Sequence, residues 1–293
     1  MVFFVGARGL RQGDPVSPYL FVLIMEVLQL ILHQFIDQDI GFSYHWKYQD
    51  LGLFQLCFAD DLLLFCKADE PSIRLFRIGL HLFASLFRLH ANPQKSQLIL
   101  SKATQPGREA FLASLSFQVG HLPVRYIGLS LIASRLIISD CQPLFQKIDS
   151  RIHGWDGIRL SFAGRVQLIK SVLMALDVYW AMTFILPKGV SKEIEKRLCS
   201  FLWKGTASSG YLKVAWDQVC KPLAEGVQGL RDILALNRAL MSRHLWAIIA
   251  WERNSIWVNW IVQTRLRDKS LWTVTKGKGS WGWRKLLKLR PIL

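Results

Sequence analysis

Two adjacent carboxylates, Asp60 and Asp61, interrupt an otherwise apolar run that extends from Gln55 to Cys66. Burying like charges side by side is unfavourable, because each carboxylate loses its hydration and the pair repels by about 4 kcal/mol at close range in a protein surface environment. Two short strands joined by a turn would leave both acids in water. A divalent cation such as Mg²⁺, which prefers oxygen ligands, is the alternative. The run alone leaves both interpretations open.

A long apolar helix is predicted to begin at Ser17. Ser17 can act as its N-cap, and Asp14 offers a second possible start. Apolar residues between Leu20 and Phe35 cover most of the circumference, so we expect the helix to be largely buried. Polar positions such as Glu26 and His33, together with its length, argue against a membrane span.

The loop before this helix contains Gly13, which lets a backbone approach a ligand closely. Helix N-termini also attract phosphate groups. A tight turn without a ligand explains the loop equally well.

Four blocks follow one another along the chain: Arg11-Gln-Gly-Asp-Pro-Val-Ser-Pro18, Phe58-Ala-Asp-Asp61, His90-Ala-Asn-Pro-Gln-Lys-Ser96 and Arg125-Tyr-Ile-Gly-Leu-Ser-Leu131. In this order they resemble reverse transcriptases, and their wording is similar to the plant non-LTR (LINE-type) retrotransposon branch. The resemblance is strong from residue 9 to 132 and looser from 140 to about 250.

The resemblance implies a role for each block. It implies that Asp60 and Asp61 are catalytic residues and Mg²⁺ ligands on a hairpin of the polymerase palm. It implies nucleotide- or template-binding roles for Arg11, Gln12, Gly13, Pro15 and Lys95. It also implies that Tyr126 and Gly128 grip the primer end. The implied partners are an RNA template, a DNA primer and deoxynucleotides, with no membrane; the oligomeric state stays open.

The implied fold class is α+β, with a partial palm of antiparallel sheet and helices followed by a mostly α-helical thumb and C-terminal region. We expect a partial palm over residues 1–134, a helical thumb-like region over 135–205, and a basic, tryptophan-rich region over 206–293.

Hydrophobic periodicity and turn residues predict the elements within these parts. The palm part is expected to contain a helix near 71–87, a strand near 96–100 and a hairpin near 117–132. Helices are expected near 161–187, 191–203 and 237–251. The tryptophans in and after the last helix are expected in its core, namely Trp246, Trp251, Trp257 and Trp260.

One part of the family's site has no counterpart in the sequence. Reverse transcriptases carry a further catalytic carboxylate before the Arg-Gln-Gly-Asp-Pro block, whereas residues 1–8 contain no acid. The resemblance therefore implies an N-terminally truncated fragment without the fingers, and we expect no measurable polymerisation by this chain alone. A non-catalytic nucleic-acid-binding module and a pseudogene product are the alternatives.

Positive charge is concentrated in the second half of the chain, whose total net charge is +16. Residues 1–140 carry 12 Lys and Arg against 11 Asp and Glu, whereas residues 141–293 carry 25 against 10. This distribution suits a phosphate backbone, although a solvated surface without a partner is possible. The cations and tryptophans after residue 265 suit single-stranded nucleic acid, and the glycines among them equally suit a frayed terminus.

The five cysteines are odd in number and lack the C-x-x-C spacing of a zinc site. Burial in strands explains Cys57 and Cys66 most simply. Since no secretory signal begins the chain, we expect a reducing compartment, nuclear or cytoplasmic.

Overall fold

The computed structural model describes residues 13–38, 41–100, 117–155, 160–206, 214–225, 228–267, 269–275, 277 and 279–293. Contacts between residues divide the chain into two compact units, Met1–Leu131 and Ile132–Leu293. The predicted α+β fold class is confirmed. In the described segments the strands belong to the first unit, and the second unit is helical.

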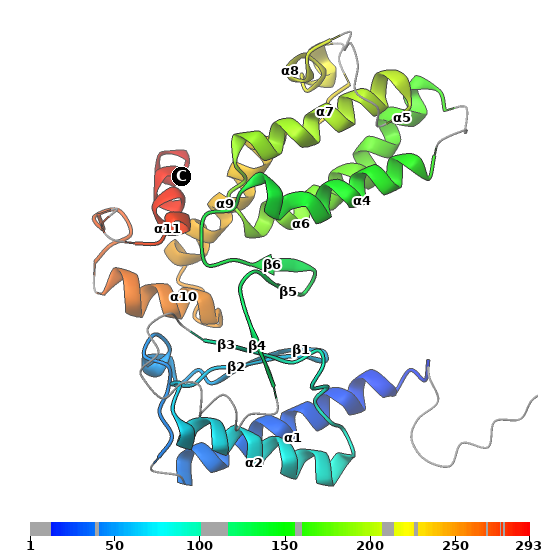
Figure 1. The fold of residues 1–293 in the computed structure, drawn as a ribbon. Coiled ribbons are helices and arrows are strands. Elements are labelled where there is room, and N and C mark those ends of the chain that lie inside the picture. Colours follow the sequence, from blue (N-terminus) through cyan, green and yellow to red (C-terminus); the bar gives the residue numbers. More distant parts are fainter. Residues whose placement is uncertain are drawn as a thin grey trace, which may run out of the picture. The chain divides into compact units, whose positions relative to one another are not determined.

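Two helices form one layer of the first unit, α1 (Ser17–Gln38) and α2 (Glu70–Phe87). They run side by side on one face of a hairpin made by β1 (Gln55–Phe58) and β2 (Asp61–Leu64) (Figure 1). Gly79 of α2 permits the close approach, because a Cβ atom there would meet the Leu32 side chain at 2.5 Å. The N-cap of α2 is Asp69, whose side chain accepts a hydrogen bond from the backbone of Ser72.

Helix α1 is less buried than the sequence predicts. Leu28, Leu32 and Ile36 are buried against α2, whereas other apolar side chains, including Leu23 at 62% exposure, face solvent. The prediction of a largely buried helix is therefore wrong, because the described residues of the first unit pack against only one face of α1. Among the described helices, α1 alone has the length and apolar composition to cross a membrane, a property that it shares with core helices of soluble proteins.

The strands in the described part of the first unit form three separate pairs. The antiparallel β1–β2 pair and a second antiparallel pair, β5 (Val124–Tyr126) with β6 (Leu129–Leu131), are hairpins as predicted. Between them, β3 (Gln97–Ile99) pairs in parallel with β4 (Gln118–Gly120). In place of one antiparallel sheet, the described strands form two antiparallel pairs and one parallel pair, and residues 118–120 belong to the parallel pair rather than to the last hairpin.

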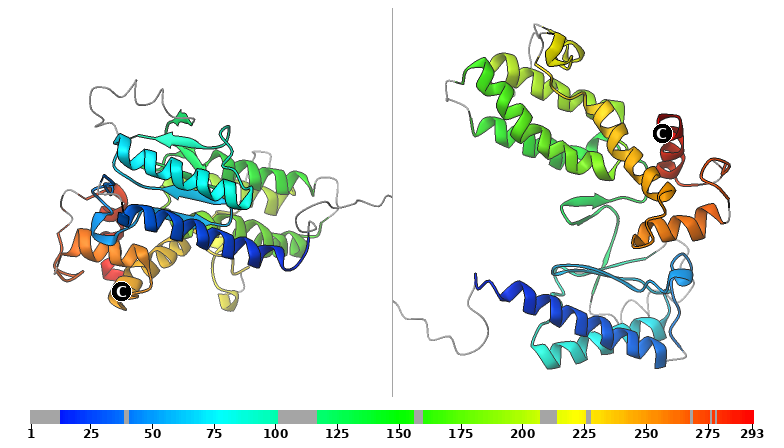
Figure 2. Two further views of the ribbon diagram at one scale, coloured as in Figure 1. Left: turned by 90° about the horizontal axis from the view of Figure 1, so that it is seen from below. Right: turned by 180° about the vertical axis from the view of Figure 1, so that it is seen from behind.

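The second unit is built on a bundle of α4 (Gln142–His153), α5 (Phe162–Leu168), α6 (Met174–Thr183) and α7 (Lys188–Lys204) (Figure 2). A π-helical turn, η3 (Ile169–Leu173), joins α5 to α6. Then follow α8 (Trp216–Val219), α9 (Ile233–Ile249), α10 (Ile256–Ile261) and α11 (Trp281–Leu286). Short turns complete the unit: η2 (Ile138–Cys141), η4 (Leu223–Glu225), η5 (Val262–Leu266) and η6 (Leu287–Ile292). Both predicted regions, 135–205 and 206–293, lie within this unit, where α9 packs against α6 and α7.

A buried amide ties the bundle to α9. The Asn237 side-chain amide donates to the carbonyl groups of Ala181 (2.7 Å) and Phe184 (2.8 Å), and its oxygen accepts from the backbone N–H of Leu186 (2.9 Å). These three bonds satisfy backbone groups where α6 ends, so that the turn between α6 and α7 is held by a residue far along the chain.

A buried carboxyl group lies on α6. Asp177 is fully buried, and neither of its oxygens receives a hydrogen bond from another described residue. Burial raises the pKa of Asp177 to about 7, although its own backbone amide and the charge of Arg231 act in the opposite direction.

The C-terminal segment is packed in its described part. Trp283, Leu286 and Leu287 are buried together with residues of α9 and α10. The Arg290 guanidinium donates to the Val274 carbonyl (2.7 Å) and fastens the last turn to the preceding loop. A frayed terminus is therefore wrong for these residues, and Trp283 is a core residue.

The tryptophans around α9 and α10 are, by contrast, more exposed than predicted. Trp246, Trp251 and Trp257 are exposed, and Trp260 is half-buried beside the Arg265 guanidinium. The expectation of a tryptophan core here is wrong, because the interior of this part is filled by Met241, Leu245, Ile248, Ile261 and Leu266.

Candidate active site on the first hairpin

The acid pair lies at a two-residue turn. Phe58 pairs directly with Asp61, so that Ala59 and Asp60 alone connect the strands. Ala59 has φ +50°, a left-handed conformation that is unfavourable for a residue with a Cβ atom. The thiol of Cys57 donates to the Ala59 carbonyl at 3.3 Å and supports this turn from the β1 side.

Both carboxylates of the turn are exposed. Water can therefore hydrate them, and the hairpin needs no cation for its own stability. Exposed oxygen ligands on adjacent residues nevertheless suit a hard divalent cation. In the described segments, no three His, Cys, Asp or Glu side chains come together as a possible metal site, so Asp60 and Asp61 lack a third partner there.

The predicted primer-grip residue Tyr126 lies near this pair. The pKa of the Tyr126 phenol is raised, first by burial, then by the negative charge of Asp61, and least by Cys57. The fold therefore brings the end of β5 into electrostatic reach of the start of β2, although more than sixty residues separate them in sequence.

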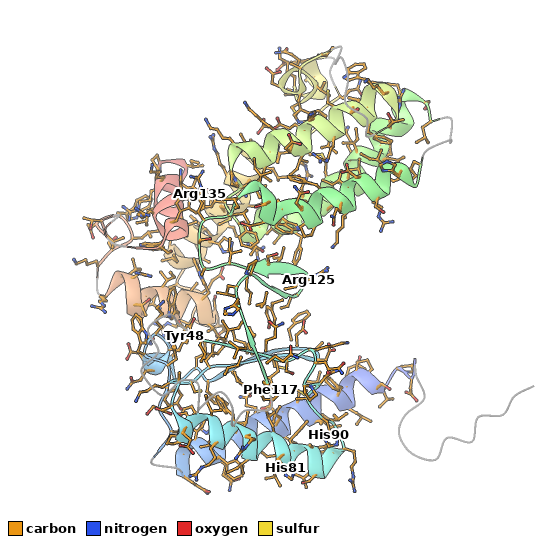
Figure 3. The ribbon with its side chains drawn as sticks, in the orientation of Figure 1. Tyr48, His81, His90, Phe117, Arg125 and Arg135 are labelled. Atoms are coloured by element: carbon orange, nitrogen blue, oxygen red, sulfur yellow. The ribbon has the colours of Figure 1, made fainter. Side chains whose placement is uncertain are left out.

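A second tight turn follows Tyr126. Tyr126 pairs with Leu129, and the two residues between them, Ile127 and Gly128, have φ +48° and +76°. Positive φ at both positions is the type I′ pattern typical of two-residue hairpins. Gly128 fits this geometry, whereas Ile127 is a β-branched residue in a conformation that such residues rarely adopt. Arg125 projects from the same hairpin (Figure 3).

The start of α1 is formed by Asp14. Its side chain accepts from the Val16 backbone (2.9 Å) and its carbonyl from the Ser17 backbone (3.1 Å), so the Ser17 hydroxyl is not the N-cap. Gly13 has φ +87°, and a Cβ atom there would meet no neighbour. Glycine is thus required by the backbone conformation rather than by crowding. Pro15 follows the Asp14 turn, whereas Arg11 and Gln12 lie outside the described residues.

Lys95 belongs to a polar turn before β3. The Asn92 side chain accepts from the backbone of Gln94 (2.9 Å) and Lys95 (3.3 Å), which makes an Asx turn. The Lys95 side chain is exposed. No hydrogen bond or ion pair joins it to the acid pair among the described residues, and its predicted phosphate contact stays a prediction.

The cysteines of the hairpin differ from expectation. Cys57 is exposed rather than buried, since it lies on the outward side of β1 beside the turn. Partial desolvation and then the charge of Asp60 raise the pKa of its thiol. Cys66 is half-buried, and burial followed by the charge of Asp69 raises its pKa to about 12.

Comparison with known proteins identifies the family that the first unit matches. Residues 2–131 match the reverse transcriptase (RNA-dependent DNA polymerase) family. All of the predicted site residues lie within this reverse transcriptase match, from Arg11 to Gly128. The match ends where the first compact unit ends.

Two relatives extend the comparison. A ribonuclease H protein of Arabidopsis thaliana is 35% identical over 157 residues, which are 51% of this chain and 25% of that protein. The retrovirus-related Pol polyprotein of a type-2 retrotransposable element from Drosophila melanogaster is 29% identical over 147 residues, 45% of this chain and 12% of the polyprotein. This chain therefore spans a quarter or less of each relative.

One group in the first unit escapes the motif-based prediction. The segment from Phe42 to Tyr48 contains four aromatic residues and His45, but it matches no block of the reverse transcriptase resemblance. Its density of rings was the available signal. The structure shows that several of these rings contact one another, and that His45 and Trp46 are stacked.

Proposed function

We propose that the first unit is part of the palm of an RNA-directed DNA polymerase from a LINE-type retrotransposon of the plant branch. The observation that carries this proposal is the tight hairpin that exposes Asp60 and Asp61 within the segment that matches reverse transcriptases. Tyr126 near Asp61 supports it, because two segments of the resemblance then meet at one place. The Pol polyprotein of a retrotransposable element among the relatives supports the retrotransposon part of the proposal.

Asp60 and Asp61 would hold Mg²⁺. Magnesium is often bound by one or two carboxylates together with substrate phosphates, while it keeps several waters. When bound, the ion would neutralise charge on the phosphates and on the attacking and leaving oxygens during nucleotide addition. The chain's own contribution would be to hold the two carboxylates at a two-residue turn, with Tyr126 within electrostatic reach of Asp61.

We further propose that the 293-residue chain performs no measurable polymerisation by itself. Two metals need more carboxylate than one adjacent pair supplies, and the described residues offer no third ligand. Positioning and charge neutralisation are the main sources of catalysis in such reactions, so an incomplete ligand set removes most of it.

Primer extension on an RNA template with Mg²⁺ and deoxynucleotides tests the inactivity. We expect no extension from the wild-type chain. Extension that Asp60→Asn abolishes would refute inactivity while supporting the site. The metal site itself is tested with Mn²⁺ as a paramagnetic probe: line broadening near Tyr126 should disappear in the Asp60→Asn/Asp61→Asn variant and persist in Asp50→Asn. Equal broadening in all three proteins would overturn the metal assignment.

A second candidate function is a nucleic-acid-binding module that uses the second half without catalysis. The observation that favours it is the excess of 25 Lys and Arg over 10 Asp and Glu in residues 141–293. Binding through phosphates releases counterions, so the affinity for RNA should fall steeply as salt rises.

All five cysteines are free thiols, which supports a nuclear or cytoplasmic, reducing compartment for either function.

A further inference from the structure

A row of neighbouring rings leads from half-buried residues of the first unit to its surface. We call it the aromatic ladder: Phe65, Tyr48, His45 and Trp46. The ring centroids of Tyr48 and Phe65 lie 5.1 Å apart, and those of His45 and Tyr48 also 5.1 Å. Trp46 stacks on His45 at 5.9 Å with an interplanar angle of 25°. Trp46 is the outermost ring, and 75% of it is exposed.

The backbone holds the ladder in place. The Lys47 N–H donates to the Nδ1 atom of His45 at 3.2 Å, and the Tyr48 N–H donates to the His45 carbonyl at 2.8 Å. Burial and then the charge of Lys47 lower the pKa of His45, which favours the neutral ring whose Nδ1 atom can accept. The exposed tryptophan therefore rests on a preorganised ring and not on a loose loop.

The ladder lies at the open end of the hairpin that carries the acid pair. Phe65 donates its backbone N–H to the Phe54 carbonyl at 2.7 Å, directly beyond the last pair of β1 and β2. Asp61, at the other end of β2, is four residues away, or about 13 Å along an extended strand. Figure 3 shows Tyr48 beside the short η1 turn (Gln49–Leu51) at this end.

A cation accompanies the exposed ring. The Lys47 ammonium lies 5.1 Å from the centre of the Trp46 ring. Lysine is flexible and suits a phosphate as a point charge. An exposed aromatic face with an adjacent cation is the combination by which proteins bind single-stranded nucleic acid, because every base offers a stacking face and every nucleotide a phosphate.

We propose that Trp46 stacks on a base of a single-stranded RNA segment bound to the first unit, while Lys47 meets a neighbouring phosphate. Phe65, the ring of the ladder next to β2, lies about 13 Å from Asp61 along the strand. Trp46 lies three ring contacts further on, so an RNA strand bound at Trp46 would reach the hairpin turn over several nucleotides. The choice of RNA rests on the proposed function. A protein partner is less well supported, since the ladder presents one ring with polar neighbours rather than a broad apolar patch.

The test compares two fluorescently labelled oligonucleotides of equal length, a single-stranded RNA and an abasic strand with the same backbone. Affinities are measured by anisotropy with the full 293-residue chain. Trp46→Ala should weaken binding of the base-containing strand by ~5- to 150-fold, the range expected for one stacked base, and leave the abasic strand unchanged. Trp46→Phe, which retains a ring, should lose less. Trp246→Ala removes a tryptophan of α9 that is 58% exposed, and it serves as the matched control.

Several outcomes would overturn the stacking proposal. One is an unchanged affinity of Trp46→Ala for the base-containing strand, and another is equal weakening for both strands. A third is a Trp46→Ala protein that changes its oligomeric state on gel filtration but binds RNA as the wild type does. The last would identify the ring as a protein contact. Circular dichroism of Trp46→Phe separates misfolding from lost stacking. Asp60→Asn/Asp61→Asn should retain the preference for bases, so failure of the metal site and failure of the ladder remain distinguishable.

Discussion

The phenol of Tyr126 lies within electrostatic reach of the Asp61 carboxylate, and this charge adds to burial in raising the pKa of Tyr126. This electrostatic interaction links the two hairpins of the first unit close to their tight turns. A half-buried tyrosine that responds to the charge of an exposed acid provides a spectroscopic probe of the candidate active site that needs no substrate.

Asp61→Asn should lower the pKa of Tyr126, because phenolate formation would no longer be opposed by a neighbouring negative charge. The pKa should stay above its ordinary value of 10.0, since burial remains the larger cause. An ultraviolet absorbance titration measures the shift, and Tyr126→Phe identifies the signal. Tyr48, whose pKa is raised by burial alone, should titrate identically in both proteins. An unshifted Tyr126 would contradict the contact.

Substitutions at Ala59 should report the strain of the acidic turn. Ala59→Val places a β-branched residue at φ +50° and should lower the free energy of unfolding by roughly 1–2 kcal/mol. Ala59→Gly relieves the same conformation, and its flexible unfolded state offsets part of the gain, so stability should rise by about 0.5 kcal/mol or stay level. Chemical denaturation measures both. Because residue 59 is exposed, equal stabilities would mean that the turn has no left-handed residue.

Asp177 should make the stability of the second unit depend on pH. Its pKa of about 7 in the folded chain lies above the ordinary value of 3.8, so the folded state binds the proton more tightly. Stability is therefore highest below about pH 4 and falls as pH rises towards 7. Between pH 5 and pH 8 the loss should be on the order of 2–3 kcal/mol.

Asp177→Asn removes this titration, and its unfolding free energy should change less between pH 5 and pH 8 than that of the wild type. Glu252→Gln, which neutralises an exposed carboxylate of the same unit, should retain the wild-type dependence. Urea denaturation at the two pH values makes the comparison. The burial of a neutral acid would be contradicted if the unfolding free energy of the wild type rose from pH 5 to pH 8 while that of Asp177→Asn stayed constant.

Asn237→Asp should destabilise the second unit more strongly at pH 8 than at pH 5. A carboxylate can only accept, yet two carbonyl oxygens face the Nδ2 atom at 2.7 and 2.8 Å. Ionisation would leave a buried charge against two acceptors, so we expect a loss of roughly 3–5 kcal/mol at high pH. Asn259→Ala breaks one exposed bond to the Arg253 carbonyl and should cost less than about 1 kcal/mol. Similar losses for both variants would show that Asn237 is no clamp.

The local chemistry of the first unit could be predicted from its sequence. Apolar residues on both sides of Asp60-Asp61 can form strands. Because the two carboxylates need hydration, they are expected at the turn between these strands. The helix over 71–87 follows from apolar residues at helical spacing, although its cap is Asp69. The hairpin after Tyr126 was expected from the family resemblance, whereas its closeness to Asp61 is a tertiary property that no spacing reveals.

Burial was predicted less well, because periodicity shows which face is apolar but not what covers it. Leu23 and Leu28 lie on one apolar helix, yet only Leu28 is buried, since α2 reaches one side. Trp246 and Trp283 are the same residue type, yet packing leaves Trp246 exposed and buries Trp283 in the core. The parallel pairing of β3 with β4 also depends on partners distant in sequence.

The two-residue turn at Ala59 and Asp60 has a consequence for length variation in this part of the chain. Since side chains alternate along a strand, inserting one residue between Phe58 and Asp61 would rotate the pairing and move Asp61 to the opposite face. The longer connection between α1 and β1 has no such periodic constraint. In a library of single-codon insertions across residues 41–67, tolerance should therefore drop sharply at the acidic turn, even though the turn is more exposed than the loop before it.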